Sequence, residues 1–405
     1  MSEPSSSQRQ RDSVTIVGAG PSGLVCALFL VRAGVPVTVL EQGAGLAEDM
    51  RASTFHAATL DLLQGTGVVR TLLGQGTRVP RWQYLRHGTT DRVVFDLGKL
   101  ADVTDHPYRL QVEQFRLTSA IVERLRDEPL FKLCRGARVT RIEQDDNAVN
   151  IRFDEHGAER QEQSRWLIAA DGGRSTIRKS LGLAFEGSVF PRTSITLVLD
   201  NRFQDQVDGL LGVNYVWTDD GHYSLMRVRD LWRFSFAPRN EDDPVEARET
   251  AAAQARLQAV FPRSKPYRIQ QLNHYTIQQR CLDHFRHGRV LFCGDSAHLN
   301  SPAGGMGMNS GVHDAACLVE HLVPVLDGAE PGLLDRYDRR RRRIAQEEVQ
   351  RISARNYQRH RETDPQRREQ IWQELQETAA DPARHRDFLL ETSMIRSRQR
   401  ELEIE

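Results

Sequence analysis

The stretch VTIVGAGPSGLVCALFLVRAGVPVTVLE, residues 14–41, decides the fold of this chain. The apolar run at 14–17 favours a β-strand, and a glycine-rich turn follows at 18–23. The next segment, LVCALFLVRAG, has the apolar pattern of a helix, and VPVTVLE predicts a second strand that ends at Glu41. This order of strand, turn, helix and strand is the context in which G-x-G-x-x-G indicates a dinucleotide-binding unit.

The residues of the turn suit a bound pyrophosphate. Gly18 allows a tight turn, Gly20 lets the pyrophosphate approach the backbone, and Gly23 lets helix and strand pack closely. The helix N-terminus offers N–H groups and a partial positive charge, and Glu41 can accept hydrogen bonds from ribose hydroxyls. The alternative is a glycine turn with a purely structural role. We favour dinucleotide binding, although this motif alone does not separate NAD from FAD.

Two later strands end in the same way. The run in RWLIAADGGRSTIR, residues 165–178, stops at Asp171, and the run in RVLFCGDSAHLNSPAGGMGMNSG, residues 289–311, stops at Gly294-Asp295. Ligands of open α/β sheets bind at the carboxyl ends of strands. One long dinucleotide that lies across several strand ends explains all three motifs, whereas three unrelated turns would be a coincidence.

Together, GAGPSG, ADGGRSTIR and CGDSAHLNSPAGGMGMN resemble the motifs of the single-component FAD-dependent aromatic hydroxylases, flavoprotein monooxygenases of the p-hydroxybenzoate hydroxylase-like family. The similarity runs from about residue 13 to about residue 325. It implies an α/β fold: a Rossmann-like three-layer FAD-binding domain, an inserted antiparallel β-sheet substrate domain and C-terminal helices. It also implies a reaction in which NAD(P)H reduces the flavin and a flavin C4a-hydroperoxide transfers oxygen to the substrate.

The resemblance also implies which residues contact the cofactor. Asp295 matches the acid that binds the ribityl chain, residues 307–309 match the backbone at the flavin's pyrimidine edge, and Pro302 matches a proline that faces the substrate. The helix after Met308 would aim its N-terminus at the negative charge of reduced flavin. The expected FAD contacts are Gly18, Gly20, Pro21, Ser22, Gly23, Glu41, Gln42, Arg51, Gln114, Asp171, Gly294, Asp295, Gly307, Met308 and Asn309.

The expected organisation follows from these matches and from the strand pattern. We expect residues 1–12 to be disordered and residues 328–405 to form a helical region. Alternating, strand-like runs between residues 186 and 280 predict the inserted sheet. The FAD-binding domain is expected at 13–79, 105–185 and 282–327, and the substrate domain at 80–104 and 186–281.

The inserted sheet supplies candidates for the substrate side. In YSLMRV we expect Tyr223, Leu225 and Arg227 on one face, with Arg227 as a hypothetical carboxylate anchor. His222 or Tyr223 could help to deprotonate a phenol, whereas His56 and His298 are better explained as structural residues. The candidate substrate-side residues are Pro302, Tyr215, Tyr223 and Arg227, with Trp217, Trp232 and Phe234 as a possible aromatic lining.

Composition restricts the partners. The 405 residues carry 55 bases and 55 acids, so the net charge gives no reason to expect a nucleic-acid or membrane partner. The 5 cysteines form no C-x-x-C pair, which predicts reduced, buried thiols, no metal site and a cytoplasmic protein. The polar N-terminus lacks the apolar core of a signal peptide. We expect a monomer or a homodimer.

The basic run at Arg339–Arg343 has two interpretations. It could bind nucleic acid or anionic lipid, but we favour a solvated helix face balanced by neighbouring acids. Apolar residues further along could dock on the main body or on a second subunit. They are Ile371, Trp372, Leu375, Phe388, Leu389, Leu390 and Ile395.

The sequence therefore predicts an FAD-dependent, NAD(P)H-consuming monooxygenase that hydroxylates a small activated aromatic compound with molecular oxygen. The ring bears a phenolic, amino or hydroxy-heteroaromatic group. One alternative is a flavin dehydrogenase or reductase of the same fold that inserts no oxygen. Another is a non-enzymatic dinucleotide-binding interaction protein. The sequence leaves open the ring substrate, NADH against NADPH and the identity of the catalytic base.

Overall fold

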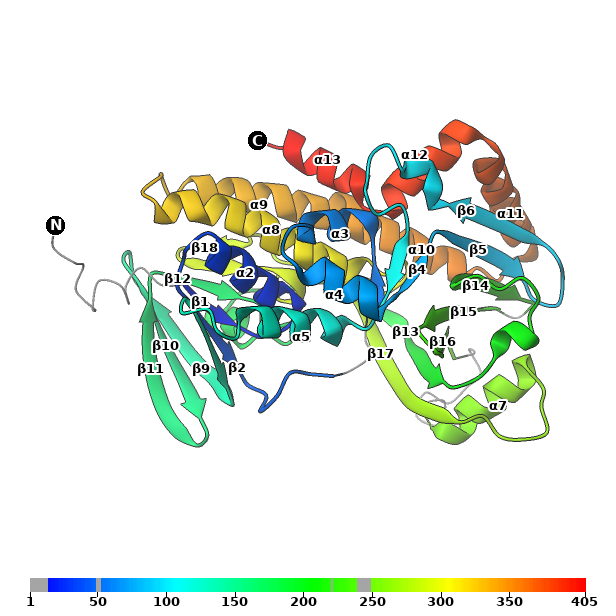
Figure 1. The fold of residues 1–405 in the computed structure, drawn as a ribbon, viewed down its shortest axis with the longest axis horizontal. Coiled ribbons are helices and arrows are strands. Elements are labelled where there is room, and N and C mark those ends of the chain that lie inside the picture. The colour runs from blue at the N-terminus through cyan, green and yellow to red at the C-terminus, as the bar shows by residue number, and fades with distance from the viewer. Residues whose placement is uncertain (1–13, 49–51, 220, 239–248) are drawn as a thin grey trace.

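The computed structural model describes residues 14–48, 52–219, 221–238 and 249–405. Residues 1–12, for which the sequence predicts disorder, and Arg51 lie outside these described ranges. Figure 1 shows an elongated molecule with the parallel sheet near one end and a larger antiparallel sheet near the other.

A parallel sheet forms the centre of the first half. Its strand order is β18-β19-β12-β1-β2-β8, with only β18 antiparallel to its neighbour. All residues of β1, β12 and β19 are buried, as expected for a sheet covered on both faces. The strands are β1 (Val14–Val17), β2 (Val37–Glu41), β8 (Phe131–Arg135), β12 (Trp166–Ala169), β18 (Arg286–His287) and β19 (Val290–Phe292).

Helices and a second sheet complete the three layers around that centre. Helix α2 packs against both α5 and α8, and a separate antiparallel sheet of order β11-β10-β9 shares the same apolar core (Figure 1). This arrangement confirms the predicted α/β fold class. The elements are α2 (Pro21–Arg32), α5 (Gln114–Leu125), α8 (Met306–Leu326), β9 (Ala137–Gln144), β10 (Val149–Glu155) and β11 (Ala158–Ser164).

The second half is built on an 8-stranded sheet of order β20-β17-β13-β16-β15-β14-β5-β6. Two distant segments meet in it, because β14 pairs in parallel with β5 and places Tyr215 beside Tyr84. The strands are β5 (Arg81–Arg86), β6 (Arg92–Asp96), β13 (Glu186–Leu199), β14 (Val213–Thr218), β15 (Gly221–Val228), β16 (Leu231–Phe236), β17 (Ile269–Cys281) and β20 (His298–Leu299).

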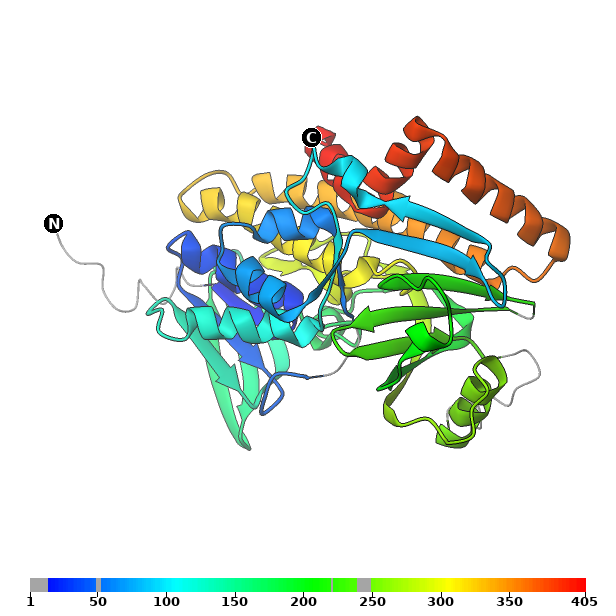
Figure 2. The same cartoon turned by 45° about the vertical axis from the view of Figure 1, so that its right-hand side comes forward.

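Both faces of this sheet are buried. One face packs on helix α7 (Thr250–Val260), with Val216 and Leu225 among its core residues. The other face carries Tyr215 and Trp217 and packs on the C-terminal helices (Figure 2). Burial on both sides means that alternation along a strand does not by itself indicate which face borders a functional site.

The C-terminal helices cover the second face. Residues Ile371, Trp372, Leu375, Leu389 and Ile395 belong to the same apolar core as Trp82 and Phe95, so this region docks on the main body. The helices are α9 (Leu333–Ile344), a π-helical segment η5 (Ala345–Gln350), α10 (Arg351–Arg361), α11 (Pro365–Ala380), α12 (Pro382–Thr392) and α13 (Ile395–Glu403).

The basic run on α9 corrects one prediction. Arg340 and Arg341 are buried rather than solvated, and Arg341 pairs with Asp314 and Glu401. The prediction of a solvated face balanced by neighbouring acids holds for Arg343, which is exposed and pairs with Glu347. It is wrong for Arg340 and Arg341, and the partners of Arg341 are distant in sequence. Within the described ranges, every helix is too short or too polar to cross a membrane.

Smaller elements connect these layers. One of them is a 3-stranded sheet with the strand order β3-β7-β4. Its strands are β3 (Thr54–Phe55), β4 (Thr77–Val79) and β7 (Arg109–Gln111). The remaining helices are α3 (Ala57–Leu63), α4 (Val68–Gln75) and α6 (Thr176–Ser180). Short 3-10 turns lie at Leu97–Leu100, Phe203–Asp205 and Gly294–Ser296.

Candidate active site

The three sequence motifs lie at one edge of the parallel sheet. Strands β2, β1, β12 and β19 are neighbours and run in the same direction, so their carboxyl ends meet. Glu41 is the last residue of β2, Gly18 directly follows β1, and Asp171 and Gly294 come two residues after the ends of β12 and β19. The structure therefore brings together segments that are up to about 270 residues apart, as expected for a ligand that crosses several strand ends.

The first turn requires its glycines. Gly18 has a φ of 105°, and a Cβ there would lie 2.4 Å from the carbonyl oxygen of Ala170. A Cβ on Gly23 would lie 2.1 Å from the carbonyl oxygen of Gly18. Helix α2 begins at Pro21 with Gly20 as its N-cap, and no side chain caps it. Its first N–H groups are therefore oriented for an anion rather than for a side chain.

Glu41 fixes the neighbouring backbone. One of its carboxylate oxygens accepts a hydrogen bond from Ala19 N at 2.8 Å, and the other accepts one from Gly43 N at 2.7 Å. The side chain thus ties the end of β2 to the glycine turn, and each oxygen retains acceptor capacity. Gln42, the next residue, is exposed.

The second motif is joined to the third. Asp171 Oδ2 accepts hydrogen bonds from Thr176 N and Ile177 N at the start of α6, while its Oδ1 is buried with no partner among the described residues. Burial raises the pKa of Asp171. Arg178 Nη1 donates to Ser296 O at 3.0 Å, which connects this turn to the segment after β19.

The third motif is held from helix α8. Gly294 N donates to Asp314 Oδ2 at 2.9 Å, and His298 Nε2 lies 2.8 Å from the same oxygen. Ser22 packs against both Gly294 and Gly311, where an added Cβ would lie 2.3 Å from its hydroxyl oxygen. Asp295 is exposed at the turn itself. His298 is thus a structural partner of Asp314, as the sequence analysis expected.

The N-terminus of α8 is uncapped and rigidly placed. Gly305 is its N-cap in the left-handed region, and no side chain caps the helix. Asn309 Oδ1 accepts from His56 N at 3.0 Å, and its Nδ2 donates to Thr54 O and Gly305 O. The first turn of α8, including Gly307 and Met308, therefore presents its N–H groups and its dipole in a fixed direction.

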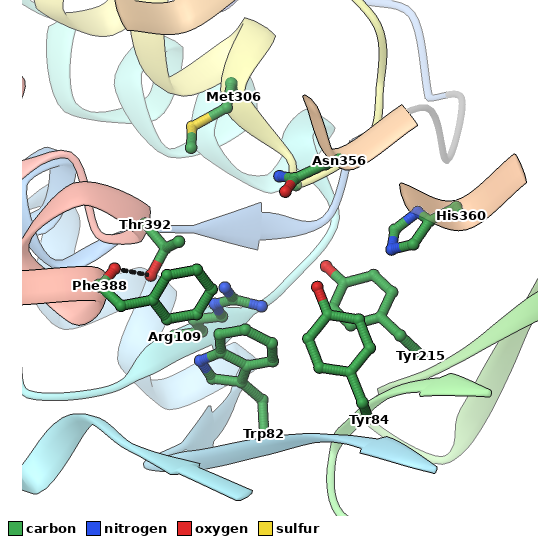
Figure 3. Close-up of a pocket in the computed structure, with 10 residues that line it drawn as sticks. Trp82, Tyr84, Arg109, Tyr215, Met306, Asn356, His360, Phe388 and Thr392 are labelled. Carbon is green, nitrogen blue, oxygen red and sulfur yellow. Dashed lines mark hydrogen bonds between the residues drawn. The ribbon is translucent and has the colours of Figure 1, made fainter. Parts of the chain in front are cut away.

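A small pocket borders this helix start (Figure 3). Its free space is about 10 Å³, on the order of one water molecule. Aromatic side chains project into it from the antiparallel sheet, and α10 and α12 close the other side. The lining residues are Trp82, Tyr84, Arg109, Tyr215, Gly304, Met306, Asn356, His360, Phe388 and Thr392.

Comparison with known proteins agrees with this geometry. The family model described as "FAD binding domain" matches residues 11–352. The chain is 33% identical over 395 residues to the para-nitrophenol 4-monooxygenase of Pseudomonas sp. (strain WBC-3), covering 96% of this chain and 97% of that protein. The crystal structure of p-nitrophenol 4-monooxygenase from Pseudomonas putida DLL-E4 superposes with a TM-score of 0.88 at 30% identity, covering 94% of this chain and 97% of that one.

This chain belongs to the FAD-binding domain family. A further relative is the 6-hydroxy-3-succinoylpyridine 3-monooxygenase of Pseudomonas putida, 31% identical over 346 residues and covering 83% of this chain and 85% of that protein. The cofactor of the protein described here is FAD, and this chain is an FAD-dependent aromatic monooxygenase.

The residues present fit FAD. The N-termini of α2 and α8 lack side-chain caps, and α8 packs on the strand-end edge through Gly311, which lies against Ser22 and Gly294. Neither Gly18 nor Gly304 has room for a side chain. A Cβ on Gly18 would lie 2.4 Å from Ala170 O, and a Cβ on Gly304 would lie 2.7 Å from Asn356 Nδ2. Asp171 offers a buried, unpaired oxygen on the same edge. These features suit a ligand with a central pyrophosphate and a flat ring system.

The substrate-side candidates separate into two groups. Tyr215 lines the pocket, with its ring centroid 5.3 Å from that of Tyr84. Tyr223 is buried on the opposite face of the sheet, and Arg227 is exposed. Pro302 is exposed and does not line the pocket. The predicted common face of Tyr223, Leu225 and Arg227 is therefore the face that points away from the pocket.

The aromatic candidates also divide by face. Trp232 and Phe234 belong to the core under α7, away from the pocket. Trp217 is on the pocket face but packs on Trp372, with ring centroids 5.8 Å apart. His222 stacks on His360 one ring beyond the pocket, at 4.8 Å. Of the candidates, Tyr215, Trp217 and His222 thus lie on the face of the sheet that borders the pocket.

Sequence reasoning missed most of the pocket. Arg109, Asn356, His360 and Thr392 occur in no motif, whereas Trp82 and Tyr84 lie in the segment 80–104 that was expected in the substrate domain, although neither was named as a candidate. One signal was present: the dense aromatic run RWQY at 81–84 has strand character. It gives no indication that its partner is β14.

Proposed function

We propose that this protein uses NAD(P)H and molecular oxygen to hydroxylate a small, single-ring phenolic substrate. The observation that carries the proposal is the position of the pocket. Gly304 and Met306, at the start of α8, form one wall, and Trp82, Tyr84 and Tyr215 form another. A flat ring held between these walls would lie next to the helix start that is expected to face the flavin.

The size of the substrate is inferred from the pocket and from the relatives. The free space in this structure is about that of one water molecule, so a single ring enters only as the lining side chains move apart. The lining rings of Trp82 and Tyr215 have their centroids 5.8 Å apart. The two relatives with the most similar length act, by name, on para-nitrophenol and on 6-hydroxy-3-succinoylpyridine. Relatives named for tetracycline substrates are longer, since the matched part covers only 67% of one of them. These observations favour a single ring.

Bound FAD supplies the redox chemistry, accepting two electrons from the nicotinamide and activating oxygen. The protein supplies position and charge. The α2 N-terminus with Gly18 and Gly20 would hold the pyrophosphate, and the α8 N-terminus from Gly305 to Met308 would stabilise negative charge on the reduced ring. The aromatic walls exclude water from the site.

The organisation that we propose assigns the FAD-binding role to 13–79, 105–185 and 282–327, and the substrate role to 80–104 and 186–281. The C-terminal region, 328–405, shares in the substrate role. Its helices α10 and α12 contribute Asn356, His360, Phe388 and Thr392 to the pocket wall.

The test is flavin reduction by NADPH and by NADH in stopped flow with a panel of phenols, aminophenols and hydroxypyridines, followed by reoxidation with ¹⁸O₂. We expect one class of phenol to accelerate reduction and to gain one ¹⁸O atom, while the second oxygen atom leaves as water. If FAD binds and is reduced but no compound gains oxygen, the dehydrogenase alternative replaces this proposal.

A further inference from the structure

Arg109 is a buried cation in the wall of the pocket. It begins strand β7, it is 4% exposed, and its guanidinium carbon lies 4.3 Å from the centroid of the Trp82 ring. Its side chain also makes a hydrogen bond with the hydroxyl of Tyr215. Figure 3 shows the guanidinium directed towards the space that the aromatic rings enclose.

This cation has no carboxylate partner in the part of the chain that the structure describes. Among the described residues, no acid lines the pocket, no ion pair joins Arg109 to an acid, and Arg109 Nε has no hydrogen-bond acceptor. Arg341 provides the contrast, because that equally buried arginine pairs with both Asp314 and Glu401. Burying a charge without a partner is costly, and arginine is well suited to bind a planar oxyanion.

The charge acts on the surrounding groups. Burial lowers the pKa of His56 to about 3, and the positive charge of Arg109 contributes to this shift. Burial raises the pKa of Tyr215, while Arg109 opposes that rise. Opposite, Tyr84 accepts a hydrogen bond from Arg359 at 3.3 Å, and burial holds the pKa of His360 well below its usual range. The titratable groups around the pocket are therefore neutral or positive, and the α8 N-terminus adds a positive dipole end.

We propose that Arg109 is the counter-ion of the substrate's oxyanion, so that the pocket selects a small phenol in its phenolate form. The inference deepens the proposed function and rests on it. Phenolate is the more electron-rich form of the ring, and a desolvated cation stabilises it more strongly than water does. Hydrogen bonds from a planar guanidinium to the phenolate oxygen would also orient the ring within the aromatic walls.

The experiment uses the FAD-loaded protein and 4-nitrophenol, whose neutral and ionised forms differ in colour. The ligand is titrated at a pH below its own pKa, where free 4-nitrophenol is mostly neutral, and the difference spectrum is recorded. We expect the phenolate band to appear on binding, with proton release measured by calorimetry in two buffers. A bound ligand that stays neutral would overturn the inference, as would 4-nitroanisole, which cannot ionise, binding equally well.

Variants locate the counter-ion. Arg109→Gln is expected to weaken 4-nitrophenol binding at least about 30-fold and to abolish the phenolate band, whereas Arg109→Lys retains the band. Arg78→Gln is the matched control, because Arg78 is exposed on the neighbouring strand β4 and stacks on Tyr108. We expect it to bind as the wild type does. If Arg109→Gln does not fold, the wild-type spectrum still decides whether the pocket binds the ligand as phenolate. Equal phenolate binding by Arg109→Gln and the wild type would contradict the proposal.

The ¹⁸O assay on the same preparations separates the two proposals. A ligand that binds as neutral phenol and is hydroxylated leaves the proposed function standing and overturns the role of Arg109. A ligand that binds as phenolate but never gains oxygen supports the role of Arg109 and overturns the monooxygenase proposal for this ligand class.

Discussion

His360 lines the pocket with a neutral, stacked ring. Its ring stacks between Tyr215 at 4.9 Å and His222 at 4.8 Å, and its Nε2 is buried with no partner among the described residues. Burial holds its pKa well below the usual range, so the ring is neutral at pH 7. A buried nitrogen without a hydrogen bond destabilises the ligand-free protein, and a substrate hydroxyl or ring substituent can relieve that cost.

We therefore predict that His360→Phe raises the KM for the phenol about ten-fold, because one hydrogen bond of about 1.4 kcal/mol is lost while the stacked ring remains. The free energy of unfolding without substrate should not fall, since the variant removes an unsatisfied polar atom. Steady-state kinetics and urea unfolding measure the two effects.

The control for this substitution is His222→Phe, which changes the ring on the outer side of the same stack. It should leave KM unchanged, because His222 does not line the pocket. An unchanged KM in His360→Phe would show that His360 does not contact the substrate.

The choice of face explains which residues sequence reasoning could find. The side chains of residues 223–226 alternate between the two faces of the sheet, as the sequence predicted. Tyr223 and Leu225 lie in one apolar core, and Ser224 and Met226 are on the opposite face. Both faces are buried, so the pattern contains no information about which of them borders the flavin. The arginine of the pocket is Arg109, which comes from a different sheet and lies more than 100 residues away from Arg227.

At the scale of elements, α8 connects the cofactor edge to the C-terminal helices. Asp314 accepts from Gly294 N on one side and from Arg341 of α9 at 2.7 Å on the other. Burial alone would raise the pKa of Asp314, but His298 and Arg341 hold it far below its usual range. Arg341 in turn pairs with Glu401 of α13. The turn that is expected to hold the ribityl chain is thus braced by two helices distant in sequence.

We predict that Glu401→Gln lowers the free energy of unfolding by about 3 kcal/mol, because it leaves part of the Arg341 charge buried without compensation. Loosening Arg341 should also loosen Asp314 and Gly294, so the FAD dissociation constant is expected to rise. Urea unfolding and flavin fluorescence titration measure the two effects.

Glu403→Gln is the matched control, because Glu403 lies two residues after Glu401 on α13 and is exposed. It should change the free energy of unfolding by no more than about 0.5 kcal/mol. Equal unfolding free energies for the Glu401 and Glu403 variants would mean that the buried network does not stabilise the fold.

The same contrast explains how far the elements could be predicted. The motifs at Gly18, Asp171 and Gly294 were found because each strand, turn and acid is contiguous in sequence. The pairing of Arg341 with Asp314 and Glu401 was missed because these two partners come from two other helices, α8 and α13. The apolar residues of 363–405 suggested docking on the main body or on a second subunit, but gave no indication that Phe388 and Thr392 would line the pocket.

At the scale of the whole molecule, several histidines are buried in the neutral state. Burial lowers the pKa of His56 and of His222 to about 3, and lowers the pKa of His313 and of His360 well below 6.5. They come from distant parts of the chain, next to α3 and in β15, α8 and α10. Their burial is a property of the packed whole, because each is desolvated by elements far from it in sequence.

This burial gives the stability a defined pH dependence. Each folded pKa lies below the unfolded value of about 6.5, so the unfolded chain binds more protons and stability falls as pH drops below that value. For His56 and His222, whose folded pKa is about 3, the loss between pH 7 and pH 5.5 is about 1.2 kcal/mol each, and His313 and His360 change the stability in the same direction. We predict a fall of at least about 2 kcal/mol in the free energy of unfolding, measured by urea titration across this range. In His360→Phe the fall should be smaller, since one titrating group is gone. A free energy of unfolding that stayed constant from pH 7 to pH 5.5 would mean that these rings are accessible to protons in the folded state. That result would also contradict the assignment of His360 as a neutral hydrogen-bonding group in the pocket.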